Sequence, residues 1–86
     1  MDHSEDAILR FCRRYVADLL EIAVDSVDPD ADFDRLGIDS AIAVALLTEV
    51  EEHYDVDLPP ETLFENPSLR AVAAYLHDRL RERVAP

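Results

Sequence analysis

The sequence predicts an all-α fold: a small bundle of three long helices and one short helix, with a long first loop. Apolar residues recur at three- and four-residue steps in three separate stretches, which is the spacing of one face of an α-helix. No stretch shows the residue pattern of a strand. Nearly half of the 86 residues are apolar, so we expect one domain over residues 1–86 with a modest core between about residues 5 and 80.

The charge of the chain limits its partners. The net charge is −12, and all eight cationic residues are arginine. Nucleic acid and anionic membranes both require basic surfaces, so neither is an expected partner, whereas proteins with basic patches are. No apolar run is long enough to span a membrane, and no signal peptide is present. We therefore expect a cytoplasmic monomer.

Residues 4 to 22 are predicted to form the first long helix. Cys12 is the only cysteine and lies on the apolar face, so we expect a buried thiol rather than a disulfide. Two ion pairs at i,i+4 spacing are expected on the exposed side: Asp6–Arg10 and Arg14–Asp18. The apolar face consists of Ile8, Phe11, Cys12, Tyr15, Val16, Leu19 and Leu20.

Residues 23 to 38 are predicted to be a loop rich in aspartate. Asp28, Asp30 and Asp32 occupy positions one, three and five of a calcium-binding EF-hand loop. Position six would be Phe33 instead of glycine and position twelve Asp39 instead of glutamate, so we expect a solvated acidic loop and no metal site. Four apolar residues are expected to anchor it to the helices: Val27, Phe33, Leu36 and Ile38.

The second long helix is expected from about Asp39 to Tyr54, with its apolar stripe toward the core. The opposite side carries small apolar residues among carboxylates, which we interpret as a candidate docking surface for protein partners. The alternative is that these are ordinary surface residues that favour a helix. This candidate docking surface consists of Ala41, Val44, Ala45, Thr48, Glu51 and Glu52.

A short helix over residues 61–64 and a last helix over about residues 69–83 complete the prediction. Pro59 and Pro60 introduce the first, and Ser68 caps the second. The expected core is Phe11, Tyr15, Leu19, Leu46, Val50, Leu63, Val72 and Leu76.

The segment Leu36-Gly37-Ile38-Asp39-Ser40 holds the only glycine of the chain, where the acidic loop meets the second helix. Asp39 and Ser40 are residue types that begin helices, because a side-chain oxygen accepts from an amide of the first turn. The Ser40 hydroxyl would then lie at the end of the helix that favours negative charge, a suitable place for a phosphate ester. The alternative is that this pair is only a helix cap.

Catalysis by the chain itself finds little support in the sequence. The three histidines, His3, His53 and His77, lie on separate segments without metal-ligand spacing. Gly37 and Ser40 do not form the Gly-x-Ser-x-Gly turn of a hydrolase. We therefore interpret Ser40 as a site on which another enzyme acts.

The segment Leu36-Gly37-Ile38-Asp39-Ser40 resembles the modification motif of acyl carrier proteins. Phe33 resembles the aromatic residue of the longer Phe-x-x-Leu-Gly-x-Asp-Ser pattern, and the segment Leu63-Phe64-Glu65-Asn66-Pro67-Ser68-Leu69 is similar to the third-helix region of polyketide-type carriers. The resemblance covers nearly all of residues 5 to 80.

This resemblance implies that the Ser40 hydroxyl accepts 4′-phosphopantetheine from coenzyme A, with Gly37 and Asp39 beside the attachment site. The implied partners are a phosphopantetheinyl transferase, an acyl-loading enzyme (an acyltransferase or an adenylate-forming ligase) and a ketosynthase or other synthase enzymes. The chain would carry an acyl group as a thioester and present it to these enzymes, without catalysing a reaction or binding a metal.

Two departures from family patterns refine this interpretation. Fatty-acid carriers usually have acids two and five residues after the serine, where this chain has Ile42 and Ala45, so more apolar docking contacts are implied. Peptidyl carriers usually have Gly-Gly-x-Ser, where Ile38 and Asp39 stand here, so an acyl carrier of polyketide or related secondary metabolism is favoured.

The Met1 start favours a discrete protein. The alternatives are an excised synthase domain, a peptidyl or aminoacyl carrier, and an acidic helical interaction module without a prosthetic group.

Overall fold

The computed structural model describes residues 4–84, which are all-helical and form no strand. The elements are α1 (Glu5–Leu20), the 3₁₀ turn η1 (Val24–Ser26), α2 (Phe33–Leu36), α3 (Ser40–Tyr54), α4 (Glu61–Glu65) and α5 (Leu69–Val84). The predicted bundle of three long helices and one short helix is confirmed. The stretch predicted as loop contains two further single turns, η1 and α2. None of the helices in this part of the chain is long and apolar enough to cross a bilayer.

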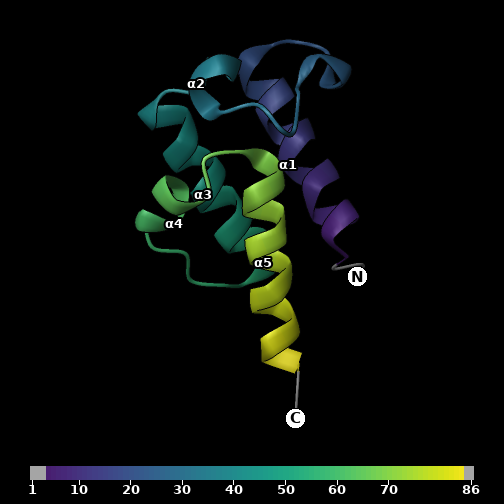
Figure 1. The fold of residues 1–86 in the computed structure, drawn as a ribbon, viewed down its shortest axis with the longest axis vertical. Helices are drawn as coiled ribbons and strands as arrows, with labels where there is room; N and C mark the ends of the chain where they lie inside the picture. The colour runs from purple at the N-terminus through teal and green to yellow at the C-terminus, as the bar shows by residue number, and fades with distance from the viewer. Residues whose placement is uncertain (1–3, 85–86) are drawn as a thin grey trace.

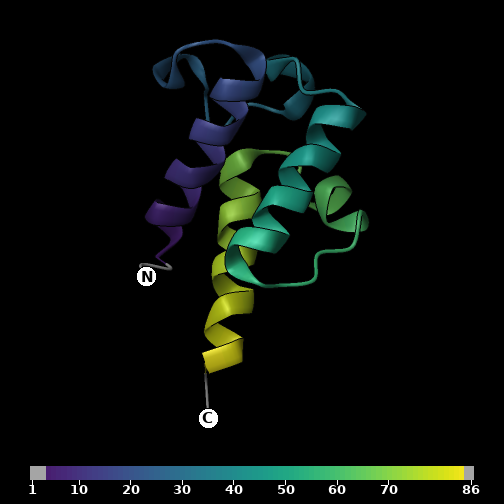
Figure 2. The ribbon, with the colours of Figure 1, turned by 180° about the vertical axis from the view of Figure 1, so that it is seen from behind.

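The three long helices enclose the core. α1 packs against both α5 and α3, and the short α4 lies beside α3 (Figure 1). The connection from α1 to α3 crosses one end of the bundle, and α3 begins at that same end (Figures 1 and 2). The start of α3 therefore lies toward the end of the bundle that the acidic connection crosses (Figures 1 and 2).

Local signals explain where α1 begins and ends. The amide of Ala7 donates to Ser4 Oγ at 3.2 Å, and two acids occupy the first turn, where the helix dipole favours them. The predicted ion pair Asp6–Arg10 is present at 3.5 Å, but the predicted pair Arg14–Asp18 is not among the ion pairs of the described residues. The helix ends at Glu21, which adopts the left-handed conformation with φ 57°.

The core is built largely as predicted. Leu46, Val50, Val72 and Leu76 are buried. Phe11, Tyr15 and Leu63 are half-buried and pack against the core cluster, and the Phe11 ring stacks on His53 with centroids 4.2 Å apart.

The prediction that Leu19 belongs to the core is wrong, because its side chain is 41 % exposed. Helical spacing does place Leu19 on the correct face of α1. However, it belongs to the last turn, and α5 begins well below that turn, so no neighbouring long helix covers it (Figure 1).

The acidic connection is held firmly to the helices. Val27 is fully buried, and Ile38 is buried while Phe33 and Leu36 are half-buried, so the predicted apolar anchors are confirmed. Arg13 Nε donates to the Val27 carbonyl at 3.0 Å. Asp30 forms an ion pair with Arg70 near the start of α5, which ties the middle of the connection to a third element.

The aspartates of the connection are exposed, as predicted for a solvated acidic loop, and two of them also have protein partners. Asp28 Oδ1 accepts from the amide of Asp30 at 2.9 Å, and Asp30 pairs with Arg70. Within residues 4–84, no three side chains of His, Cys, Asp or Glu are grouped as a metal site requires. These carboxylates therefore shape the connection locally rather than converging on one point.

Truncation to alanine should lower the free energy of unfolding much more at the buried Leu46 than at the exposed Leu19. We expect Leu46→Ala to lower the free energy of unfolding by about 2–5 kcal/mol, because it removes a fully buried branched side chain. Leu19→Ala is the matched control and should change it by less than about 0.5 kcal/mol, as is usual at surface positions. Denaturant melts of both variants measure this, and equal losses would contradict the assignment of Leu19 to the surface.

Burial also controls the chemistry of the only cysteine. The Cys12 side chain is fully buried, and desolvation raises the pKa of its thiol from 9.0 to about 12. Between pH 9 and pH 12 the unfolded chain loses this proton while the folded chain keeps it, so unfolding becomes easier as pH rises.

We therefore expect the free energy of unfolding to fall between pH 9 and pH 12 more steeply for the native chain than for Cys12→Ala. Below pH 9 the two pH profiles should run parallel, because the thiol is then protonated in both states. Urea melts at stepped pH test this. A thiol reagent should also leave Cys12 unmodified until the chain unfolds, and rapid native-state labelling would show that the thiol is accessible.

Candidate functional site

The candidate site begins with a sharp chain reversal at Gly37. Gly37 ends α2 with φ 82° and ψ 20°, a left-handed conformation that other residues adopt only at a cost. Its amide donates to the Asp34 carbonyl at 3.2 Å, and the next amide, of Ile38, donates to the Phe33 carbonyl at 2.9 Å. A Cβ at Gly37 would meet no atom within 4 Å, so the requirement for glycine comes from the backbone angle alone.

Asp39 caps the next helix. Its Oδ1 accepts from the amide of Ile42 at 2.9 Å, and its backbone carbonyl accepts from the amide of Ala43 at the same distance. The side chain therefore satisfies one amide that the helix itself cannot, as the sequence predicted. Helix α3 consequently starts at Ser40 and not a residue earlier or later.

Ser40 is the first residue of α3, and it is exposed. Because Asp39 performs the capping, the Ser40 hydroxyl is not needed to hold the helix end. It lies at the positive end of the α3 dipole, where a phosphate ester is favoured. Of the Asp39-Ser40 pair, Asp39 is the helix cap, and Ser40 is the first residue of the helix.

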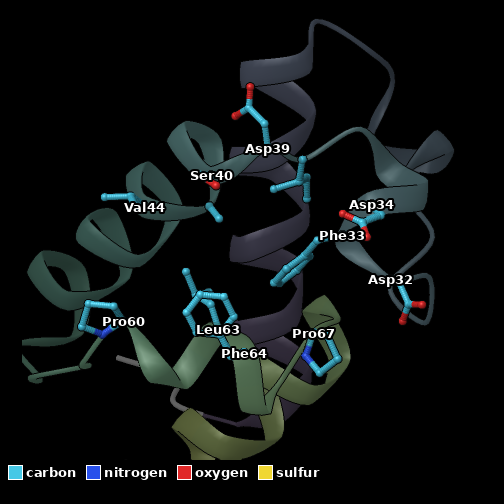
Figure 3. A pocket seen from close by; sticks show the side chains of 12 residues that line it. Asp32, Phe33, Asp34, Asp39, Ser40, Val44, Pro60, Leu63, Phe64 and Pro67 are labelled. Carbon is cyan, nitrogen blue, oxygen red and sulfur yellow. The ribbon is translucent and has the colours of Figure 1, made fainter.

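A groove of about 580 Å³ opens beside Ser40 (Figure 3). Phe33 from α2 and Leu63 from α4 face this groove, and Ala43 and Val44 line it from α3. Ser40 is thus a hydroxyl at the edge of a mainly apolar hollow. The groove is therefore formed jointly by residues of α2, α3 and α4.

The candidate docking surface divides into three parts. Ala41, Thr48 and Glu52 are exposed, and Val44 is 53 % exposed and also lines the groove. Ala45 is half-buried. Glu51 differs from the others because its Oε2 accepts from the amide of Leu58 at 3.0 Å, which ties α3 to the connection before α4.

Sequence reasoning missed that α4 contributes to the site. Phe64 is 84 % exposed and lines the groove together with Leu63. The signal was present: two adjacent large apolar residues on a helix of little more than one turn cannot both face the same core.

Neither of the two histidines within residues 4–84 lines the groove beside Ser40. His53 stacks on Phe11 near the end of α3 that is remote from Ser40. His77 lies on α5, and His3 lies outside the described residues.

The sequence matches the family described as "Phosphopantetheine attachment site" over residues 12–76, which is most of the chain. The chain belongs to this family. It is a carrier whose prosthetic group, 4′-phosphopantetheine, is attached covalently. The matched residues include Gly37, Asp39, Ser40 and all of α3 and α4.

The relatives include large synthases. The chain is 38 % identical over 71 residues to the 5-methyl-1-naphthoate synthase of Streptomyces sahachiroi, covering 83 % of this chain and 4 % of that protein. It is 34 % identical over 74 residues to a phenolphthiocerol/phthiocerol polyketide synthase of Mycobacterium tuberculosis, covering 86 % of this chain and 4 % of that protein. The chain therefore spans only a small fraction of these relatives.

Solved structures of carriers share the fold. A free-standing peptidyl carrier protein from Acinetobacter baumannii superposes with a TM-score of 0.86 at 26 % identity, covering 92 % of this chain and 99 % of that chain. BlmI, a type-II acyl carrier protein from Streptomyces verticillus, gives a TM-score of 0.78 at 30 % identity, covering 88 % of this chain and 89 % of that chain. The bundle is thus the fold of both acyl and peptidyl carriers.

The residues around Ser40 fit a phosphopantetheine group. The exposed hydroxyl at a helix N-terminus suits a phosphodiester, and the adjacent groove is lined mainly by apolar side chains. Among the described residues, no basic side chain lines the groove, so the positive end of α3 is the main source of favourable charge for the phosphate.

Proposed function

We propose that Ser40 is the attachment residue and that the chain carries an acyl group for synthase enzymes of polyketide or related secondary metabolism. The observation that supports this best is that Asp39, and not Ser40, caps α3. The Ser40 hydroxyl is therefore exposed and available for modification. The polyketide assignment is supported by the similarity to polyketide synthases over most of the chain.

The attachment step is a phosphoryl transfer from coenzyme A. The Ser40 Oγ attacks the phosphorus next to the pantetheine, and the bond from that phosphorus to the bridging oxygen breaks. Adenosine 3′,5′-bisphosphate leaves, and a base on the transferase takes the serine proton. The terminal thiol of the attached group supplies the chemistry of the carrier, which is to hold an acyl group as a thioester.

The residues of the chain position this hydroxyl and recognise enzymes. Gly37 turns the chain into α3, and Asp39 fixes the first turn of that helix. The proposed partners are the transferase, an acyltransferase or adenylate-forming ligase that loads the acyl group, and a ketosynthase or other synthase enzyme. The chain is then the substrate of these enzymes and not a catalyst.

A peptidyl carrier is the second candidate, because a peptidyl carrier protein is among the structural relatives. Ile38 and Asp39 before Ser40 favour the acyl class, since peptidyl carriers usually have Gly-Gly-x-Ser at this place.

Incubation with coenzyme A and a broad-specificity phosphopantetheinyl transferase tests the assignment of Ser40. Intact mass spectrometry should show one phosphopantetheine on the native chain and none on Ser40→Ala. Ser26→Ala is the matched control, because it removes the hydroxyl of an exposed serine on η1 outside the attachment segment and should preserve the modification. Modification of Ser40→Ala, or no modification of the native chain, would refute the proposal.

The candidate docking surface on α3 gives a second test. Val44→Arg places a charge beside Ser40 without touching the core, so it should keep the native circular dichroism spectrum. We expect it to slow acyl transfer by the loading enzyme at least about tenfold, because a desolvated charge at an interface centre costs well over ~1.4 kcal/mol.

Asp78→Asn is the matched control, since it also makes the net charge less negative, but near the far end of α5, and should transfer at the native rate. Transfer to Val44→Arg at the native rate would exclude this face of α3 as a docking surface.

A further inference from the structure

Three large aliphatic side chains are exposed where α1 ends. Leu19 is 41 % exposed, and Ile22 and Val24 are each 42 % exposed. Single exposed aliphatic residues are normal, but three within six residues form a local apolar surface that requires an explanation. We refer to Leu19, Ile22 and Val24 as the α1-end patch.

A loose backbone does not explain this exposure. The amide of Ile22 donates to the Ala17 carbonyl at 3.0 Å, and the Val24 carbonyl accepts from Arg13 Nη2 at 3.0 Å. Val27, three residues further along, is fully buried. The backbone here is held by hydrogen bonds. It buries Val27 fully but leaves the three side chains of the α1-end patch partly exposed.

Acids outnumber cations around the patch, where the guanidinium of Arg13 donates to the Val24 and Val27 carbonyls. Asp18, Glu21 and Asp25 are exposed beside it, and the last turn of α1 contains no basic residue. A helix C-terminus favours cations, and a left-handed residue such as Glu21, with φ 57°, is more often glycine or asparagine. The helix dipole and the backbone angle thus both favour residues other than glutamate at this position, and an acid here suits contact with a basic surface.

The patch lies at the same end of the bundle as Ser40. The end of α1, η1 and the start of α3 all lie toward that end, with η1 and the start of α3 on opposite sides of it (Figures 1 and 2). Between residues 18 and 39, which link these points, the chain has eight acids and one arginine. An enzyme that approaches Ser40 therefore meets an acidic surface with two apolar regions, the exposed face of α3 and the α1-end patch.

We propose that the α1-end patch is a second docking surface, for the phosphopantetheinyl transferase that modifies Ser40. The matching surface on the transferase has an apolar centre bordered by lysine or arginine. This inference rests on the proposed function of Ser40.

The transferase is the partner that needs this surface most. It acts on the chain before any arm is attached, so it must bring the Ser40 hydroxyl itself into its active site. A specific protein interface covers about 20–30 residues on each side, whereas the exposed face of α3 next to Ser40 supplies only a few. Contact on the α1 side of Ser40 supplies further apolar area and complementary charge.

Steady-state kinetics of modification test this with a broad-specificity phosphopantetheinyl transferase and coenzyme A as the probe, followed by intact mass. The double variant Leu19→Ser/Ile22→Ser removes the apolar centre without changing the net charge. We expect KM for the chain to rise roughly tenfold while kcat changes little, because docking is weakened and the Ser40 geometry is retained. Circular dichroism and thermal melts check that the fold persists.

A charge variant keeps the test decisive if the double variant unfolds. Glu21→Gln/Asp25→Asn should lower kcat/KM at low salt, and the difference from the native chain should shrink as salt rises. Asp6→Asn/Asp78→Asn changes the net charge equally at sites away from the patch and should behave as the native chain.

The experiment distinguishes failure of the docking proposal from failure of the Ser40 assignment. If the native chain is modified and both patch variants match it at every salt concentration, the docking proposal is wrong and the carrier function stands. If the native chain is not modified at all, the assignment of Ser40 fails and the docking proposal fails with it.

Discussion

The site depends on a change of direction between two helices within three residues. Gly37 ends α2 in a left-handed conformation, and Asp39 begins α3 by capping it. Each requirement is local, but neither would place Ser40 correctly if the preceding connection could move. The hydrogen bond from Arg13 Nε to Val27 and the ion pair of Asp30 with Arg70 hold that connection against α1 and α5. The position of one hydroxyl thus depends on anchors far from it in the sequence.

Helical periodicity predicted the fold because the long helices are amphipathic and amphipathicity reports burial directly. The α2 turn was missed because a single turn of helix has no periodicity to detect. Leu19 shows a different limit. Its spacing is correct for the core, but spacing along one helix does not reveal where a neighbouring helix begins. Only the packing shows that the last turn of α1 extends past α5 (Figure 1).

The segment that we propose for attachment could be identified in the sequence because its features belong to adjacent residues. Gly37, Asp39 and Ser40 act through backbone angle, capping and position, all of which are local properties. The groove beside Ser40 could not be predicted, since its walls come from α2, α3 and α4. Glu51 illustrates the same point for the docking surface: the sequence shows an acid on α3, but only the structure shows that its carboxylate accepts from the amide of Leu58.

The distribution of charge follows from what a carrier must do. A domain that only had to fold would balance its acids, because a large net charge opposes compaction. Eight of the twenty acids lie between residues 18 and 39, in the segment that leads to Ser40, with one arginine among them. We propose that this acidic segment attracts the basic surface of a partner enzyme toward Ser40. The anchoring of the acidic connection therefore serves two purposes at once: it fixes the hydroxyl in space and it fixes the charge that directs an enzyme toward it.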